Sequence, residues 1–171
     1  MERRQETTMG GGAVTLLGTT PKVGDKAPAF HAVKKDLTPF ELKEVLGKGI
    51  VIISAVPSVD TPVCELQTKR FNEEADKIDG VKILTISMDL PFALDKFCSA
   101  FGIKSIELLS DSKDRSFGMN YGVFIEELGL LNRSLFVIDK EGVIRYLEVV
   151  KENTNHPDYD ACLEAVRALA K

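Results

Sequence analysis

The feature that most constrains the fold is an almost continuous apolar run, Ile50-Val51-Ile52-Ile53-Ser54-Ala55-Val56. The run has the length of a strand and is far shorter than the roughly 20 apolar residues that span a bilayer. It is rich in β-branched residues and does not alternate with polar ones, which is typical of a strand buried on both faces of its sheet. A chain with such a strand must also supply helices that cover the sheet.

Amphipathic segments after the run meet that need. Apolar residues recur at helical spacing from Asp60 to Gly80 and again from Pro91 to Gly102, with a second buried strand at 81–88 between them. The other expected elements are strands at 106–109, 134–138 and 143–149, a helical turn at 114–118 and a closing helix at 158–170. This order predicts an α/β, thioredoxin-like fold, a mixed central β-sheet flanked by helices.

The first part of the chain is expected to begin with a flexible tail and to continue as a β-hairpin. The stretch 1–12 is charged and then glycine-rich, has no apolar core of a signal peptide, and is predicted to be a flexible tail. The apolar stretch 13–17 and the turn-rich stretch 23–28 are predicted to form the hairpin. Thr38-Pro39-Phe40-Glu41 resembles a helix start with Thr38 as its N-cap. A single domain is expected at 13–171.

Composition excludes several function classes. The chain has 22 Lys and Arg against 26 Asp and Glu without a basic block, which argues against a nucleic-acid binder. Cys64, Cys98 and Cys162 are too few for a disulfide scaffold, and no C-x-x-C exists for a dithiol or zinc site. His31 and His156 lack metal-ligand spacing. No metal, cofactor or membrane partner is expected, and the lack of a signal sequence favours a cytoplasmic location.

The segment with the clearest chemical potential is Ser54–Cys64, which leaves the buried strand and enters the next helix. Cys64 is predicted in the first helical turn, where unpaired backbone N–H groups and the helix dipole favour a thiolate. Thr61 lies three residues earlier, within reach of the sulfur, and Pro57 and Pro62 stiffen the loop. The alternative is that Cys64 is a small apolar residue that continues the buried stripe of its helix.

These residues carry a resemblance to a known family. Pro57-x-x-x-Thr61-x-x-Cys64 resembles the active-site signature of peroxiredoxins, and the string from Pro57 to Cys64 with Arg70-Phe71-Asn72 is similar to the thiol peroxidase branch of the atypical 2-Cys peroxiredoxins. Two further blocks are similar to that branch: Ser87-Met88-Asp89-Leu90-Pro91-Phe92-Ala93 leading to Phe97-Cys98, and Asp158-Tyr159-Asp160-Ala161. The resemblance extends from about Ala13 to the end of the chain.

The resemblance implies a role for each matching residue. Cys64 would be the peroxidatic nucleophile, which a hydroperoxide oxidises to a sulfenic acid. Thr61 would bond the thiolate and the peroxide, and Pro57 would shield the pocket. Arg133, at the start of a predicted strand, would favour the thiolate and stabilise charge on the departing oxygen. Cys98 would be the resolving cysteine, which closes an intrachain disulfide with Cys64. The family also suggests a homodimer and recycling by thioredoxin or a similar dithiol protein.

Other interpretations remain open at this point. Without the family, Cys98 could equally be a core residue, and Arg133 a solvated charge at a strand edge. Cys162 lies on the inner stripe of the last helix and is expected to be inert. The leading interpretation is a peroxidase for hydrogen peroxide and organic hydroperoxides; the alternative is a non-catalytic thioredoxin-like redox sensor or binding module that relays oxidation to a partner protein. A disulfide needs Cα atoms within about 7 Å, so local unwinding of one or both cysteine helices is expected.

Overall fold

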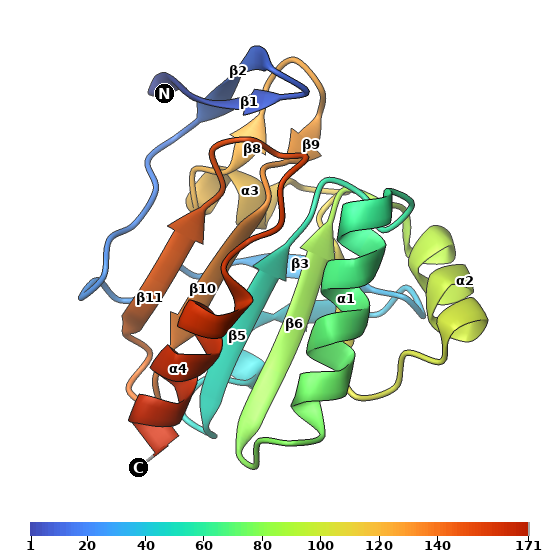
Figure 1. Cartoon of the computed structure of the whole chain (residues 1–171), viewed down its shortest axis with the longest axis vertical. Coiled ribbons are helices and arrows are strands. Elements are labelled where there is room, and N and C mark those ends of the chain that lie inside the picture. Colours follow the sequence, from blue (N-terminus) through green and yellow to red (C-terminus); the bar gives the residue numbers. More distant parts are fainter. Residues whose placement is uncertain (171) are drawn as a thin grey trace.

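The computed structural model describes residues 1–170, which form a central mixed sheet with helices on both faces and a smaller sheet beside it (Figure 1). The strand order of the central sheet is β11-β10-β5-β6-β7-β3-β4, with β5, β6 and β7 parallel and β10 antiparallel to β5. Its strands are β3 (His31–Lys34), β4 (Pro39–Glu41), β5 (Ile50–Ala55), β6 (Val81–Ser87), β7 (Glu107–Ser110), β10 (Ser134–Ile138) and β11 (Ile144–Val149). The helices are α1 (Pro62–Ala75), α2 (Pro91–Phe101), α3 (Ser116–Asn120) and α4 (Tyr159–Ala170). The predicted mixed sheet flanked by helices is confirmed.

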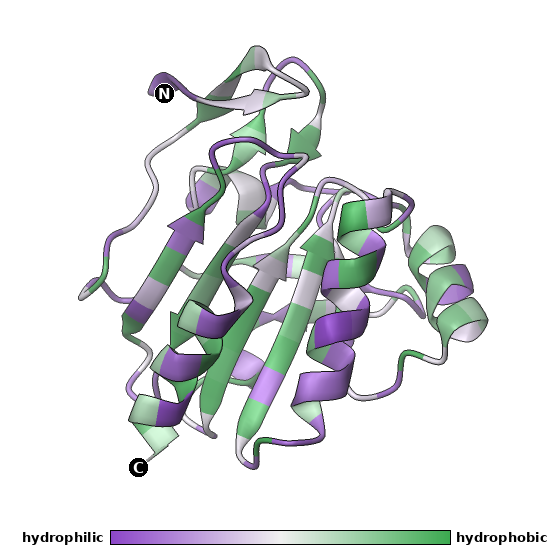
Figure 2. Ribbon diagram, in the orientation of Figure 1, coloured by the Kyte–Doolittle hydropathy of each residue, from purple (hydrophilic) through white to green (hydrophobic). Residues whose placement is uncertain are grey.

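Strand β5 is buried along its whole length, as the apolar run predicts, because each of its faces carries a separate core. Ile50 and Ile52 point into a cluster with residues of α1, α2 and α4. Val51 and Ile53 point the other way, into a cluster that holds α3. Figure 2 shows the central strands as mostly apolar and the outer surfaces of α1 and α4 as largely hydrophilic.

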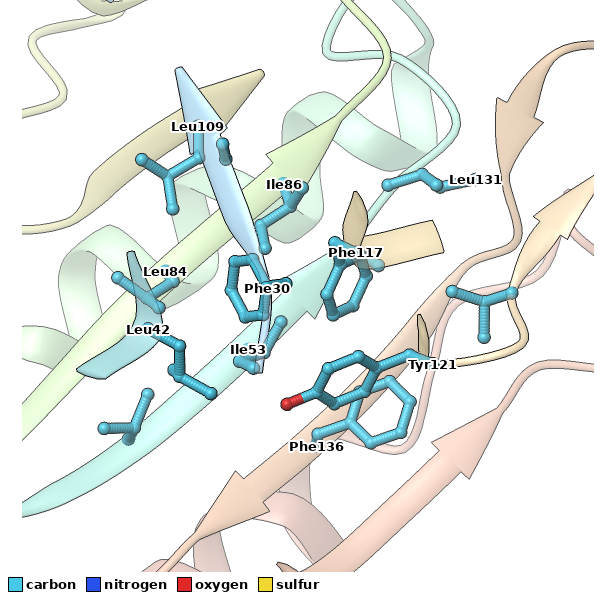
Figure 3. Packing of buried hydrophobic residues seen from close by; sticks show 14 of the residues in the cluster. Phe30, Leu42, Ile53, Leu84, Ile86, Leu109, Phe117, Tyr121, Leu131 and Phe136 are labelled. Carbon is cyan, nitrogen blue, oxygen red and sulfur yellow. The ribbon is translucent and has the colours of Figure 1, made fainter. Parts of the chain in front are cut away.

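The second of these cores is rich in aromatic rings (Figure 3). Phe117 lies 5.1 Å from Phe30 and 4.6 Å from Tyr121, measured between ring centroids. The Tyr121 hydroxyl donates to the Pro28 carbonyl at 2.9 Å, which satisfies the one polar group of this ring. Within residues 1–170, no helix has both the length and the apolar character needed to cross a membrane.

The N-terminal hairpin exists, but its strands differ from the prediction. Strand β1 (Arg3–Met9) pairs antiparallel with β2 (Gly12–Leu17). Strand β2 also pairs with β8 (Phe124–Ile125), and β8 pairs with β9 (Leu130–Leu131), which gives a four-stranded sheet. The prediction of a flexible tail over 1–12 is therefore wrong, and the stretch 23–28 is not the second strand. Gly10 and Gly11 both have positive φ, the backbone that a tight two-residue hairpin loop requires, so these glycines form a turn.

The expected helix start at Thr38 is also wrong. Pro39–Glu41 pairs with β3, and a short 3-10 helix follows at Leu42–Glu44. The Thr38 hydroxyl donates to Asp36 in the preceding turn, and the capping box is found at Glu41 and Glu44 instead. Strand pairing prevails because it buries the Phe40 ring, which is 2% exposed, in the aromatic core.

Candidate active site

Cys64 is the third residue of α1 and is 0% exposed. Thr61 is the N-cap: its hydroxyl oxygen accepts a hydrogen bond from the Cys64 backbone N–H at 3.3 Å. Pro62 occupies the first turn, where its lack of an N–H costs nothing. The sulfur therefore lies in the first turn of a helix, near the positive end of the helix dipole, as predicted.

Arg133 directs its guanidinium at this sulfur from the segment just before β10. Its Nη2 donates to Cys64 Sγ at 3.2 Å, its Nη1 donates to Gln67 Oε1 at 2.9 Å, and its Nε donates to the Asn153 carbonyl at 3.0 Å. Arg133 is 2% exposed, so it is not a solvated strand-edge charge. No carboxylate within residues 1–170 forms an ion pair with it. The buried guanidinium thus faces the Cys64 sulfur and two amide oxygens.

Gln67 is a further residue that binds the Arg133 guanidinium, and it was not predicted from the sequence. Its Oε1 accepts from Arg133, and its Nε2 donates to Ser54 Oγ at 2.7 Å at the end of β5. The side chain is fully buried. The available signal was its position three residues after Cys64, which places it on the same face of α1.

A cavity of about 360 Å³ borders this group, and Cys64 itself is not among the residues that line it. Pro57, Thr61 and Arg133 line it, so the structure brings these three predicted residues together. Its other walls are mostly apolar and come from Met9 of β1, Pro62 and Val63 of α1, and Leu128 and Leu130 near β9. The cavity thus has mostly apolar walls that include the polar side chains of Thr61 and Arg133, and Arg133 reaches from it to the buried Cys64 sulfur.

Cys98 lies in a different environment. It is the eighth residue of α2, is 6% exposed, and lines a separate cavity of about 480 Å³ with Lys34, Lys35 and Lys104 among its walls. Burial raises the pKa of the Cys98 thiol. Both Cys64 and Cys98 are free thiols on intact helices, and the two cavities share no lining residue. The structure therefore places the two sulfurs in one apolar core without joining them.

Asp89 is a second polar residue that sequence reasoning missed. Its carboxylate accepts from Ser58 Oγ at 2.7 Å and the Val59 N–H at 2.9 Å, both in the loop before α1. It also accepts from Ser87 Oγ at 2.7 Å, at the end of β6. Because Asp89 lies just before α2, one carboxylate links the loop that leads to Cys64 with the junction that leads to Cys98.

The remaining thiol and the two histidines lie apart from this group. Cys162 is fully buried on α4, and burial, followed by the charges of Glu148 and Asp158, raises its pKa to about 12. His31 and His156 are exposed and bond to Asp114 and Tyr159. Residues 1–170 contain no group of three or more His, Cys, Asp or Glu side chains that could hold a metal ion.

Comparison with known proteins gives consistent matches over nearly the whole chain. The Redoxin family model matches residues 22–163. The thiol peroxidase of Bacillus subtilis is 51% identical over 166 residues, which is 97% of this chain and 99% of that protein. The thiol peroxidase of Halalkalibacterium halodurans is 51% identical over 94% of this chain and 96% of its own length. The crystal structure of a peroxiredoxin-like protein from Aquifex aeolicus superposes with a TM-score of 0.90 at 39% identity, covering 99% of both chains.

Proposed function

Because the chain belongs to the Redoxin family and within it to the thiol peroxidases, it is a peroxiredoxin-type peroxidase, and we propose that Cys64 is its peroxidatic nucleophile. The observation that carries this assignment is the buried Arg133 guanidinium, 3.2 Å from Cys64 Sγ. A buried charge without a partner costs several kcal/mol, and a thiolate on Cys64 would supply the missing partner. Negative charge on the sulfur is what makes a cysteine a nucleophile.

The proposed first step is a displacement at oxygen. The Cys64 thiolate attacks the terminal oxygen of a hydroperoxide, an S–O bond forms, and the O–O bond breaks. The sulfur becomes a sulfenic acid, and the departing alkoxide or hydroxide takes a proton and leaves as alcohol or water. Arg133 and the Thr61 hydroxyl, which line the same cavity, would bond the oxygen on which charge develops. Pro57 would keep bulk water from one side of the sulfur.

The proposed second step resolves the sulfenic acid. The Cys98 thiol attacks Cys64 Sγ, a disulfide forms, and the sulfenic oxygen leaves as water. A dithiol protein of the thioredoxin type then exchanges with the disulfide and returns both thiols, itself becoming oxidised. The mostly apolar walls of the cavity support organic hydroperoxides as substrates beside hydrogen peroxide. The family supports a homodimer and a cytoplasmic location as further parts of the proposal.

The assignment is tested with one equivalent of hydrogen peroxide added to the reduced protein, followed by mass spectrometry of the intact chain and its peptides. The expected result is a rapid loss of two hydrogens, with Cys64 joined to Cys98 and Cys162 still free. Cys98→Ser should stop at a sulfenic acid on Cys64, and Cys64→Ser should leave the protein unchanged. Peroxide consumption that survives Cys64→Ser would overturn the proposal.

Turnover separates an enzyme that is recycled from a redox sensor. With thioredoxin, its reductase and NADPH present, the peroxidase should consume many equivalents of peroxide per chain. A protein that relays its oxidation to another partner would stop after about one equivalent. In that case the thioredoxin part of the proposal is wrong, while the assignment of Cys64 stands.

A further inference from the structure

Asn153 is a buried residue whose every polar group is engaged, and half of them hold Arg133. It is 1% exposed and lies in the segment between β11 and α4. Its backbone carbonyl accepts from Arg133 Nε at 3.0 Å, and its side-chain Oδ1 accepts from the Arg133 backbone N–H at 2.7 Å. A guanidinium is a planar fork, so fixing Nε and Nη1 determines where Nη2 points. Nη2 is the group that faces Cys64.

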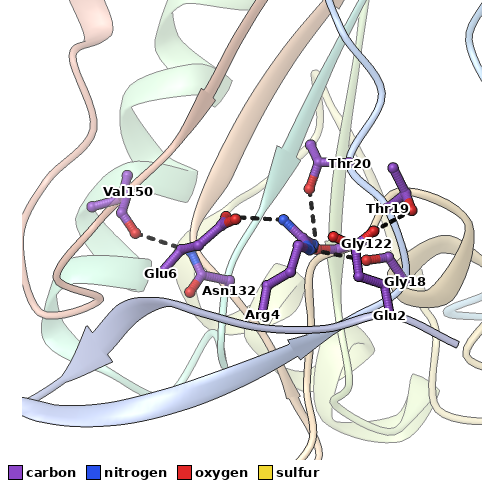
Figure 4. A network of polar contacts seen from close by, with 9 residues as sticks. All are labelled: Glu2, Arg4, Glu6, Gly18, Thr19, Thr20, Gly122, Asn132 and Val150. Carbon is purple, nitrogen blue, oxygen red and sulfur yellow. Dashed lines mark hydrogen bonds and ion pairs between the residues drawn. The ribbon is translucent and has the colours of Figure 1, made fainter.

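The other half of Asn153 is bound to the N-terminal hairpin. Its backbone N–H and its Nδ2 both donate to the Thr8 carbonyl, at 2.9 and 3.1 Å. Nδ2 also donates to Asn132 Oδ1 at 2.7 Å, and Asn132 in turn donates to the Val150 carbonyl (Figure 4). Thr8 belongs to β1, so a strand at the start of the chain supports the arginine of the site. The same strand ends in Met9, which lines the same cavity as Arg133.

The Glu152 carboxylate binds the end of β1 and the turn that follows it. The carboxylate accepts from the N–H groups of Gly11 at 2.7 Å and Gly10 at 3.0 Å, and from the Thr8 hydroxyl at 2.8 Å. It also accepts from the N–H and the hydroxyl of Thr154, at 2.9 and 2.8 Å. Hydrogen bonds from the Thr154 and Gly11 N–H groups, and then from the two hydroxyls, lower the pKa of Glu152 to about 2. The carboxylate is therefore ionised at all ordinary pH values.

A second set of contacts holds the hairpin and involves neither Glu152 nor Asn153. Arg4 donates to the Gly18 and Gly122 carbonyls and pairs with Glu6 (Figure 4). Glu127 accepts from the backbone N–H and the hydroxyl of Thr15 in β2, at 2.7 and 2.6 Å. Glu127 thus anchors the other strand of the same hairpin with the same kind of carboxylate.

We propose that the N-terminal hairpin is a working part of the active site, in which Glu152 clamps β1 so that Thr8 and Asn153 hold Arg133 against Cys64. Asn153 and Glu152 are positioning residues: neither touches the sulfur, and both act through the guanidinium. The proposal rests on the function proposed for Cys64 and Arg133. It goes beyond that function because it assigns a task to a segment outside the 22–163 core that the family model matches.

The test compares Glu152→Ala with the matched variant Glu127→Ala in the full chain. Both changes remove one exposed or half-exposed carboxylate that grips the hairpin. The first readout is the second-order rate constant of the reduced protein with hydrogen peroxide. The second is the pH dependence of Cys64 alkylation by iodoacetamide, because a looser guanidinium would move the onset of thiolate reactivity to higher pH. A general loss of stability would not move that onset.

The expected result is that Glu152→Ala slows the peroxide reaction about tenfold and moves the alkylation profile to higher pH, while Glu127→Ala matches the unmodified protein. Glu152→Gln keeps one acceptor oxygen and should fall between the two. Asn153→Ala should show a larger effect if it folds, and Glu152→Ala keeps the test valid if it does not. An unchanged profile in Glu152→Ala overturns the proposal, as does an equal loss in Glu127→Ala.

The failure of this proposal can be told apart from failure of the proposed function by a substitution at Arg133 itself. If Arg133→Lys leaves both the rate and the alkylation profile unchanged, the role proposed for Arg133 is wrong. The positioning role of Glu152 and Asn153, which acts through Arg133, then fails with it. If Arg133→Lys is impaired and Glu152→Ala is not, only the role of the hairpin is overturned.

Discussion

At the scale of single residues, the site depends on how one guanidinium is satisfied. Arg133 has three separate acceptors, namely Cys64 Sγ, Gln67 Oε1 and the Asn153 carbonyl, each on its own nitrogen. A lysine keeps the positive charge but presents it as a point, so it cannot reach all three. The geometry of the fork, and not the charge alone, distinguishes the two side chains here.

Arg133→Lys should therefore lower the second-order rate constant with hydrogen peroxide by roughly 100-fold or more, the usual cost of losing a preorganised donor to developing charge. The measurement is rapid mixing with acid quench and mass spectrometry, because the chain has no tryptophan to report by fluorescence. Arg145→Lys is the control: Arg145 pairs with Asp139 at 2.6 Å, away from the cavity, and its substitution should leave the rate unchanged. An Arg133→Lys protein within twofold of the unmodified rate contradicts this role.

Cys162 is a buried thiol that faces the charges of Glu148 and Asp158, whereas the buried Cys64 faces the Arg133 guanidinium. The pKa of Cys162 is raised to about 12, so at pH 8 it stays a neutral thiol inside the core. Iodoacetamide should label Cys64 in the folded, reduced protein and leave Cys162 unlabelled until denaturant is added. Cys162→Ala should keep the peroxide rate and cost about 1 kcal/mol of stability in urea unfolding. Labelling of Cys162 at the rate of Cys64 would contradict its assignment as a packing residue.

At the scale of elements, the sequence predicts best those segments whose pattern is local. Strand β5 and helix α1 follow from an apolar run and a 3.6-residue period, and the structure places them at Ile50–Ala55 and Pro62–Ala75. Strand β1 was missed because its residues, Arg3–Met9, are mostly polar and carry no apolar period, although its partner β2 follows directly after the Gly10-Gly11 turn. The two-residue strands β8 and β9 are too short to show any period.

The short helix α3 is tied down by a buried acid, which gives a pH-dependent stability. Asp111 is 1% exposed and accepts from the N–H groups of Phe117 and Gly118, at 2.9 and 2.8 Å. Burial raises its pKa to about 6, against the opposing effect of those two N–H groups. The folded state therefore binds more protons than the unfolded state between about pH 4 and pH 6. The stability that Asp111 contributes falls as pH rises through this window.

Asp111→Asn removes this titration. The unfolding free energy of the unmodified protein minus that of Asp111→Asn should fall by up to about 3 kcal/mol from pH 4 to pH 7. Urea unfolding of the reduced proteins at several pH values measures it. Asp79→Asn, at an exposed position, is the matched control variant over the same pH range. A difference for Asp111→Asn that stays constant or grows with pH would contradict the assignment.

At the scale of the whole molecule, the site joins segments that lie far apart in the chain. The motif Pro57–Cys64 is local, and the family resemblance carried the expectation for Arg133. Gln67, Asp89 and Asn153 were not found because their tasks are hydrogen bonds to partners that no local pattern connects with them. Asn153 in particular bonds to Thr8, in a segment that composition alone marked as a tail. Buried polar residues acquire meaning only when the fold supplies their partners.

The proposed disulfide connects Cys64 of α1 with Cys98 of α2, and we expect the reduced fold to open locally when it forms. Cys64 lies inside α1 and Cys98 inside α2, and a disulfide between them needs their Cα atoms within about 7 Å. Asp89 bonds Ser58 and Val59 before α1 while it leads into α2, so opening one junction removes a restraint on the other.

Oxidation by one equivalent of peroxide should therefore raise amide hydrogen exchange at 61–65 and 95–102 together, while β5, β6 and β10 stay protected inside the sheet. Hydrogen-exchange mass spectrometry of the reduced and oxidised protein measures this. Cys98→Ser, which would stop at the sulfenic acid, should keep the reduced pattern after peroxide. Asp89→Asn puts an amide where three donors now meet a carboxylate, so it should raise exchange at both segments even in the reduced state. Identical exchange in the reduced and disulfide forms would mean that the bridge closes without unwinding either helix.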